Sequence, residues 1–279
     1  MARETLLPPM IESIETVESQ GSPESLERYR LVEAGTIAIF GEEGAGKSIL
    51  AKGLALALNA RLFEGGKDMR EKSGGTIGTI GYQERPIQVD KELDIRQIDM
   101  MVEAIPDNPL VNESRLSGFL ATYIPDGIKI IRINVTAPAI IRMRRIKKRA
   151  LEEWEKNKDE LKSFYDRGLI SREEFERMGE ELAYKRVQLT IPKIWHEETK
   201  RRKNDIKQWT EAWPSLEGKD PLNPGTRING ERLWDLTVST GKRSKAEALE
   251  FVLDWLIANG HIEKMDLNNH IQTQQPAVA

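Results

Sequence analysis

The sequence predicts an α/β fold in which a five-stranded parallel sheet is flanked by helices and carries an inserted helical arm. Short apolar segments alternate with amphipathic helical segments along much of the chain, which is typical of a parallel sheet. Thr36–Phe40 is an apolar strand that runs into a glycine-rich turn and then a helix. Residues 150–202 break the alternation, because they read as helix between the fourth and fifth predicted strands.

The glycine-rich turn is the most informative stretch. Gly41-Glu-Glu-Gly-Ala-Gly-Lys-Ser48 fills every fixed position of the pattern G-x-x-x-x-G-K-[ST]. Glycines let the backbone bend tightly, so that its N–H groups converge on a phosphate at the N-terminus of the helix. The predicted fold is therefore that of the P-loop NTPases, with ATP and Mg²⁺ as ligands. The residues expected to bind ATP are Gly41, Gly44, Ala45, Gly46, Lys47, Ser48 and Ile49.

Two members of this loop have a specific role in phosphoryl transfer. Lys47 is expected to bridge the β- and γ-phosphates, and the Ser48 hydroxyl to bind the metal ion. Glu42 and Glu43 occupy variable positions of the pattern, where acidic side chains repel a polyphosphate unless they point outward. Glu113, an acid at the end of a predicted strand, would steady Mg²⁺ through water or serve as an ordinary hydrogen-bonded turn residue.

Composition excludes several classes of protein. The chain has 279 residues and a formal net charge of −3, which argues against a protein that coats nucleic acid. It has no cysteine, hence no disulfide and no thiolate metal site. No apolar run of about 18 residues suggests a membrane span, and residues 1–33 hold no secretory apolar core. We expect a cytoplasmic protein with no membrane partner.

The segments before the arm follow the α/β pattern. Residues 1–33 are weakly patterned and read as a flexible tail with a short helix at 25–31, and residues 72–86 are glycine-rich and read as a mobile loop. Strands are predicted at 60–63, 110–113 and 128–135, and helices at 89–104 and 116–123.

The arm begins with a strongly basic helix over 138–149, which continues to Tyr165 and turns at Arg167–Gly168. Ser171 and Glu174 fit a capping box for the next helix, and Thr190 caps a third. A loop at 214–230, a strand at 233–240 and a helix at 245–258 complete the pattern. The predicted domains are a tail (1–33), a P-loop core (34–149 with 233–260, its acceptor-binding segment at 64–104), a helical lid or arm with a loop (150–232) and a polar tail (261–279).

A kinase for a phosphorylated acceptor needs a second anion site that faces the P-loop. Arginine suits such a site, because its planar guanidinium binds phosphate oxygens in pairs and stays charged. Arg70, Arg96 and Arg115 each lie near a predicted strand edge. Any one of them alone reads best as a solvated surface residue. Together with the basic segment at 138–149, they favour an acceptor site.

With the glycine-rich turn and these arginines, the chain resembles the cytidylate kinases, of the branch typical of archaea, within the P-loop nucleoside monophosphate kinases. The resemblance covers about residues 35–149 and 233–259. The stretches that carry it are Ile37 to Ala57, Gly66-x-x-x-Arg70, Val89-Asp-Lys-Glu-Leu-Asp-Ile-Arg-Gln97, Leu110-Val-Asn-Glu-Ser-Arg-Leu-Ser-Gly118, Arg132-Ile-Asn-Val-Thr-Ala-Pro138 followed by Arg142-x-x-Arg145-Ile-x-x-Arg149, and Leu236-Thr-Val-Ser-Thr240.

The resemblance implies transfer of the γ-phosphoryl group of ATP to CMP or dCMP. Arg70, Arg96 and Arg115 would hold the acceptor phosphate. The residues expected to act in catalysis are Lys47 and the lid cations Arg145, Arg149 and Arg202.

The chain departs from the family at several positions. Ser114 stands where the family often has glycine, and Leu116 where some members have an aspartate that helps to read cytosine. The lid is lengthened by the arm, and His196 and Lys203 fall where lid arginines are expected.

These departures keep two other functions open: a P-loop kinase of another nucleotide or of a small metabolite, and a non-catalytic module that binds a partner when nucleotide is bound. The favoured interpretation of the arm is a solvated extension without chemistry, and the second is a site for a protein partner or for self-association. Nucleic acid is less favoured, because acidic residues follow the basic run at once.

Overall fold

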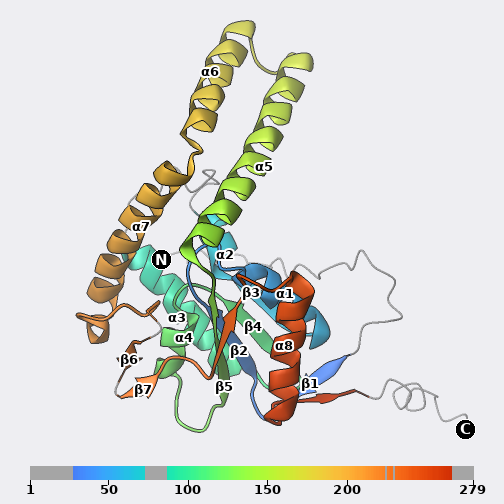
Figure 1. Ribbon diagram of the computed structural model, residues 1–279, viewed down its shortest axis with the longest axis vertical. Coiled ribbons are helices and arrows are strands. Elements are labelled where there is room, and N and C mark those ends of the chain that lie inside the picture. The colour runs from blue at the N-terminus through green and yellow to red at the C-terminus, as the bar shows by residue number, and fades with distance from the viewer. Residues whose placement is uncertain (1–27, 73–86, 224, 229, 266–279) are drawn as a thin grey trace, which may run out of the picture.

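A computed structural model describes residues 28–72, 87–223, 225–228 and 230–265. Its centre is a sheet of five parallel strands, which confirms the predicted fold class (Figure 1). Across the sheet the strands are β3 (Arg61–Glu64), β4 (Leu110–Glu113), β2 (Thr36–Phe40), β5 (Ile130–Thr136) and β8 (Leu236–Ser239). The strand that leads into the glycine-rich turn, β2, therefore lies in the middle.

Helices cover both faces of this sheet (Figure 1). On one face, α1 (Lys47–Ala57) and α8 (Lys245–Ala258) pack onto apolar side chains that include Ile37, Ile39 and Val238. On the other face, α3 (Ile87–Glu103) and α4 (Ser117–Leu120) pack around Phe40 and Phe119. Because β2 is buried on both faces, all of its residues are apolar or fully enclosed, as is typical of a central parallel strand.

The predicted mobile loop at 72–86 lies outside the described residues except for Lys72, which ends α2 (Gly65–Lys72). A short 3₁₀ helix, η1 (Ala121–Tyr123), follows α4, and another, η2 (Pro214–Leu216), follows the arm. The antiparallel pair β6 (Arg227–Ile228) and β7 (Glu231–Arg232) precedes β8.

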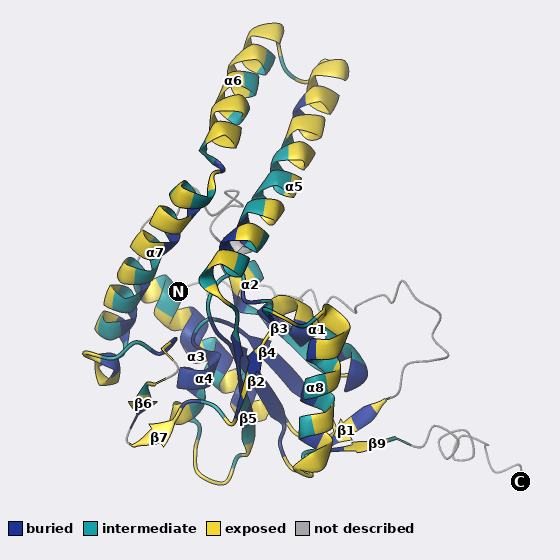
Figure 2. Cartoon of the chain, viewed as in Figure 1, coloured by how far each residue is buried: buried dark blue, intermediate teal, exposed yellow. Residues whose placement is uncertain are grey.

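The inserted arm consists of α5 (Ala139–Asp166), α6 (Arg172–Gln188) and α7 (Ile191–Ala212). The far ends of α5 and α6 project from the domain and are largely exposed (Figure 2). They are tied to each other by a hydrogen bond from Trp154 Nε1 to the Leu182 carbonyl at 2.8 Å and by a stacked ring pair, Tyr165 and Phe175. α7 runs back to the domain, where Trp209 joins the core beside α3.

The helix starts in the arm follow their predicted chemistry. Ser171 accepts from the Glu174 amide while the Glu174 side chain accepts from the Ser171 amide, so the capping box is confirmed. Thr190 accepts from the Lys193 amide and starts α7, with Pro192 in the first turn. The first cap therefore starts α6 after the turn that follows α5, and the second cap separates α6 from α7.

The two tails differ from the prediction where they are described. Residues 29–31, predicted as the end of a tail and of a short helix, form strand β1 (Tyr29–Leu31), and 262–264 form β9 (Ile262–Lys264). The two strands pair antiparallel, and Leu31 and Ile262 are buried in the apolar core between the sheet and helices α1 and α8. A three-residue strand shows no readable alternation, and its partner lies at the other end of the chain, so the sequence pattern could not reveal the pair. Among the described helices, none combines the length and the apolar character that a membrane span requires.

Candidate active site

The glycine-rich turn connects β2 to α1 at the end of the sheet from which α5 also departs (Figure 1). Gly41, Gly44 and Gly46 have φ angles of 139°, 74° and 100°, a region that side chains disfavour. A Cβ on Gly44 would lie 2.7 Å from the Arg142 carbonyl oxygen, so this glycine also permits close approach of the lid helix. The turn therefore has the backbone geometry of a phosphate-binding loop, and no side chain caps α1 where it begins at Lys47.

Lys47 and Ser48 both meet Glu113 at the end of the neighbouring strand β4. The Lys47 Nζ lies 3.6 Å from Glu113 Oε1, and the Ser48 hydroxyl donates to Oε2 at 3.1 Å. Lys47 also donates to the Glu42 carbonyl at 3.2 Å. Burial raises the pKa of Glu113, while the charge of Lys47 and the hydrogen bond from Ser48 oppose that rise. The three residues form one polar cluster beside the loop, in which Lys47 and Glu113 are buried and Ser48 is exposed.

The oxygen ligands of this cluster suit Mg²⁺. A hydroxyl from Ser48 and a carboxylate from Glu113 are the hard donors that this ion takes, usually with several waters and phosphate oxygens. Within the described part of the chain, no group of three or more acidic or histidine side chains could hold a metal ion alone. A bound metal ion would thus take the rest of its shell from water and from phosphate oxygens.

The lid arginines reach the loop through its two acids. Glu42 accepts from Arg142 at 2.9 Å and also from Arg202, which pairs with Asp220 as well. Glu43 accepts from Arg149. Burial alone would raise the pKa of Glu43, but the nearby cations, Arg149 above all, hold it well below its ordinary range. Glu42 and Glu43, whose negative charge is unfavourable beside a polyphosphate, are thus paired with arginines of α5 and α7.

Arg145 contacts the loop differently. Its guanidinium donates to the carbonyls of Gly44 and Ala45 at 3.3 and 3.2 Å, and to the Thr240 hydroxyl and carbonyl at 2.8 Å each. Thr240 follows β8, so Arg145 joins the lid helix, the loop and the last strand. The structure thus brings Arg145, Arg149 and Arg202 together at the P-loop.

The three arginines predicted to bind the acceptor lie on or directly after three different elements, α2, α3 and β4. Arg70 lies on α2, and nothing is described of its side chain. Arg96, on α3, pairs with Asp68 at 3.2 Å and lies over the Phe63 ring. Phe63 belongs to β3 and Asp68 to α2, which follows β3 directly.

Arg115 follows β4 directly and is largely buried, with 15% of its side chain exposed. Its Nη1 donates to Asp205 of α7, and its guanidinium lies over the Trp209 ring of the same helix at 5.4 Å. Its charge also acts on Glu198 and Arg142, which connects it electrostatically with the lid. Arg115 therefore contacts α7 and lies within electrostatic reach of Arg142 on α5.

Sequence reasoning missed one face of α7. Glu198, Asp205 and Trp209 are buried and recur at helical spacing, with Arg201 between the first two. Burial raises the pKa of Glu198, an effect that the charge of Arg201 opposes. The spacing of charged residues together with a tryptophan was the available signal. His196 and Lys203, which family spacing placed at lid arginine positions, are exposed instead.

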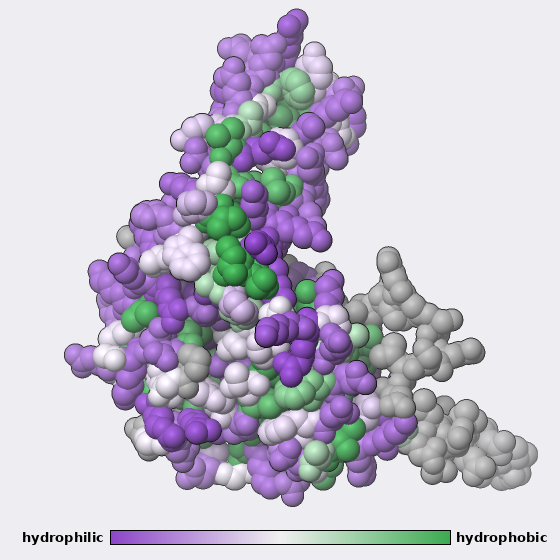
Figure 3. All heavy atoms as spheres, viewed as in Figure 1, coloured by the Kyte–Doolittle hydropathy of each residue, from purple (hydrophilic) through white to green (hydrophobic). Residues whose placement is uncertain are grey.

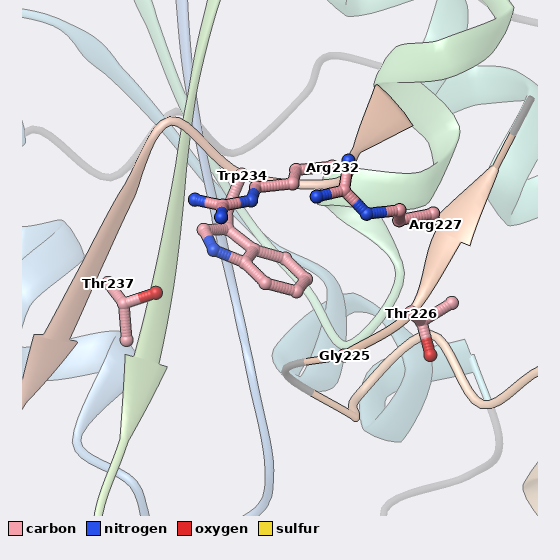
Figure 4. A pocket seen from close by; sticks show the side chains of 6 residues that line it. All are labelled: Gly225, Thr226, Arg227, Arg232, Trp234 and Thr237. Carbon is pink, nitrogen blue, oxygen red and sulfur yellow. The ribbon is translucent and has the colours of Figure 1, made fainter. Parts of the chain in front are cut away.

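A separate hollow of about 330 Å³ lies between the β6–β7 pair and the edge strand β8 (Figure 4). Its lining includes Arg227, Arg232 and the Trp234 ring, and Trp234 packs near Phe40. None of the residues that line it belongs to the P-loop or to the acceptor set, so this hollow is distinct from the candidate active site.

No protein-family model matches the chain. A cytidylate kinase of Haloarcula marismortui is 35% identical over 130 residues, which are 45% of this chain and 64% of the relative. A cytidylate kinase of Natronomonas pharaonis is 35% identical over 114 residues, 39% of this chain and 56% of the relative. The chain thus spans less than two thirds of either relative.

Among solved structures, a shikimate kinase from Acinetobacter baumannii in complex with shikimate covers 81% of this chain and 94% of its own. Its identity is 14% and the TM-score 0.42, a likeness too distant to bear on function. The parallel sheet, the glycine-rich turn and the sequence relatives all indicate the same fold. The chain has the P-loop NTPase fold, and over the matched residues it is similar to the cytidylate kinases.

Proposed function

We propose that the protein is a nucleoside monophosphate kinase that transfers the γ-phosphoryl group of ATP to CMP or dCMP, giving ADP and CDP or dCDP. The observation that carries the proposal is the meeting of Lys47, Ser48 and Glu113 beneath a loop on which lid arginines converge. Phosphoryl transfer requires in-line positioning and cancellation of charge, with little covalent help. The cluster and the arginines above it supply groups that could position the phosphates and groups that could cancel their charge.

The donor side consists of the loop and the start of α1. The backbone N–H groups from Gly44 to Ser48 would hold the ATP phosphates, and Lys47 would bridge the β- and γ-phosphates. Ser48, with Glu113 behind it, would hold Mg²⁺, which neutralises phosphate charge when bound. Gly41 and Ile49 flank this cradle.

The lid side consists of arginines that now contact the loop. Arg145, Arg149 and Arg202 would stabilise the transferring group, because a guanidinium near developing charge in a closed site is worth far more than in water. Arg149 and Arg202 bind Glu43 and Glu42 in the present state. An exchange of these carboxylates for phosphate oxygens would close the lid on the nucleotide and exclude water.

The acceptor side would consist of Arg70, Arg96 and Arg115. Paired N–H groups on arginine match two oxygens of a phosphate monoester, which favours a phosphorylated acceptor. Arg115 is largely buried beside lid residues, which supports this role. An exposed arginine in a surface ion pair would support it less, because such pairs contribute little.

The base of the acceptor would be read between α3 and β4. Leu116 is buried in the apolar core, so the position that is aspartate in some cytidylate kinases has no polar group here. Several buried polar atoms in this layer have no hydrogen-bond partner among the described residues: Gln97 Oε1, both side-chain amide atoms of Asn112, and Ser114 Oγ. Unpaired buried amides are costly, which supports a polar ligand edge in this layer.

The test is a coupled assay of ADP formation with each common nucleoside monophosphate and deoxynucleoside monophosphate, and with small metabolites. We expect CMP or dCMP to give the largest stimulation. Stimulation by another acceptor alone would make the protein a different P-loop kinase. Absence of any acceptor-stimulated ADP, with partner binding that depends on nucleotide, would make it a non-catalytic module.

The arm supports contact with protein rather than with nucleic acid. Its cations pair with acids one turn away, as in Lys148–Glu152, Lys156–Glu160 and Arg172–Glu176, so no uniformly basic surface results. The face of the arm in view in Figure 3 is mainly hydrophilic with a strip of hydrophobic side chains. Tyr184 and Val187 are 68% and 70% exposed. Self-association or a protein partner through 150–202 would appear in light scattering as a mass above that of the monomer.

A further inference from the structure

Asp205 of α7 holds Arg115, although the two belong to segments far apart in the sequence. We propose that Asp205 is a positioning residue for acceptor phosphorylation: it fixes the Arg115 guanidinium so that the Nε–Nη2 edge is presented to the acceptor phosphate. This inference rests on the proposed function and deepens it, because it assigns part of the acceptor site to the inserted arm.

The stereochemistry of the guanidinium supports this role. Arginine has five N–H donors in one plane, and two edges of that plane can bind a phosphate in a bidentate way. Asp205 accepts from Nη1, so this bond lies outside the edge formed by Nε and Nη2. Nε of Arg115 is buried and has no hydrogen-bond partner among the described residues. The remaining edge therefore carries an unpaired, desolvated donor, which is costly unless a ligand pairs with it.

The plane of the guanidinium is fixed as well as its edge. The Trp209 ring lies 5.4 Å from Arg115 Cζ, a distance at which the ring attracts the cation. Trp209 is itself part of the core beside α3. Asp205 is 5% exposed, and Arg201 on the preceding turn lies 3.9 Å from its carboxylate. Arg115 is thus oriented by two residues on one rigid helical face.

The same helix also contacts the donor side. Arg202, three positions before Asp205, pairs with Glu42 in the P-loop. α7 therefore touches the loop with one side chain and the acceptor arginine with another. Its backbone sets the separation of the two sites. A buried ion pair is weak evidence for stability but can specify geometry, which is the use assigned to Asp205 here.

The test compares wild type, Asp205→Asn, Asp205→Ala and the control Glu211→Ala, an exposed acid on the same helix. With the best acceptor from the screen, we expect Asp205→Ala to lower kcat/KM for the acceptor about 10- to 100-fold, as expected for a misplaced binding group, with the KM for ATP unchanged. Asp205→Asn should recover part of the loss, since its amide oxygen still accepts from Nη1. Glu211→Ala should behave as wild type.

A double-mutant cycle separates positioning from folding. In an Arg115→Ala background, Asp205→Ala should cause no further loss for the acceptor, because the residue that it orients is gone. A purely structural role would lower the melting temperature and impair ATP and acceptor use alike. If wild type is active and the Asp205 variants keep or improve their acceptor kcat/KM, the inference is wrong. If wild type forms no ADP with any acceptor, the proposed function fails, and this inference fails with it.

Discussion

The hydroxyl of Ser48 donates to Glu113 Oε2 at 3.1 Å, which links the first turn of α1 to the end of β4. This link joins the residue expected to bind Mg²⁺ to a buried acid. Glu113→Gln keeps a hydrogen-bond acceptor but removes the negative charge behind the metal site. We expect the Mg²⁺ concentration for half-maximal ADP formation to rise several-fold to about tenfold, because hard cations favour carboxylate oxygens. An Mg²⁺ titration measures it. A titration curve that coincides with wild type would exclude Glu113 from metal binding.

Lys47→Ala should abolish phosphoryl transfer while the fold survives. Loss of one group that stabilises charge in the transition state costs on the order of 100-fold or more in rate. The matched control is Lys52→Ala, which removes a half-exposed lysine from the same helix. Circular dichroism melting of both variants reports on the fold. Transfer that persists in Lys47→Ala, or a lost melting transition, would contradict the assigned role.

Arg115→Ala should impair acceptor use far more than ATP binding. Its guanidinium lies beside lid groups, and truncation removes a bidentate phosphate donor. Steady-state kinetics with each substrate varied in turn separate the two effects. An equal loss for both substrates, or for neither, would remove Arg115 from the acceptor site.

Glu42 and Glu43 compete with phosphate for the lid arginines if the exchange of partners described above occurs. A double variant, Glu42→Gln with Glu43→Gln, keeps the size of both side chains and removes two negative charges next to the loop. We expect ATP to bind several-fold more tightly, because like charge near a polyphosphate is repulsive. Calorimetric titration measures the affinity, and weaker binding would show that these acids help to organise the loop instead.

Asp94 gives the protein a pH-dependent stability. Burial raises its pKa to about 7, with Asp90 adding to the rise, while the hydrogen bond from Trp213 Nε1 at 2.8 Å opposes it. The folded state thus holds a proton that the unfolded state loses above its pKa of 3.8. The contribution of Asp94 to stability therefore falls as pH rises from 3.8 to about 7 and is constant above.

Asp94→Asn removes this titration and leaves an oxygen for Trp213. The variant should gain melting temperature relative to wild type as pH is raised from 5 to 8. The comparison is best made between the two proteins at each pH, which cancels the titration of all other groups. A difference that does not change with pH would show that Asp94 titrates normally.

The sequence predicted the central features because their signals are local. The glycine pattern at 41–48 follows a strand and precedes a helix, and that context predicted the fold that the structure confirms, while the donor site stays a prediction. The capping box at Ser171 and the cap at Thr190 are likewise decided by neighbouring residues. The end of α8 at Ala258 was predicted to the residue, since apolar spacing and the following Asn-Gly mark it.

What the sequence could not reveal depends on contacts between distant segments. The pairing of β1 with β9 joins the two ends of the described chain, and neither strand has enough residues for a readable period. The charged face of α7 looks like a solvated surface until Arg115 is placed against Asp205. The partners of Glu42 and Glu43 are equally non-local, because they lie on α5 and α7.

The central claim is that one cradle of backbone amides beside Lys47 and one of guanidinium groups at Arg115 face each other across a single cleft. The most direct test is calorimetric binding of a bisubstrate analogue, adenosine and cytidine joined 5′ to 5′ through five phosphates. We predict one molecule bound per chain, far more tightly than ATP or CMP alone, with the gain lost in both Lys47→Ala and Arg115→Ala. Binding no tighter than ATP, and unchanged by Arg115→Ala, would contradict the account.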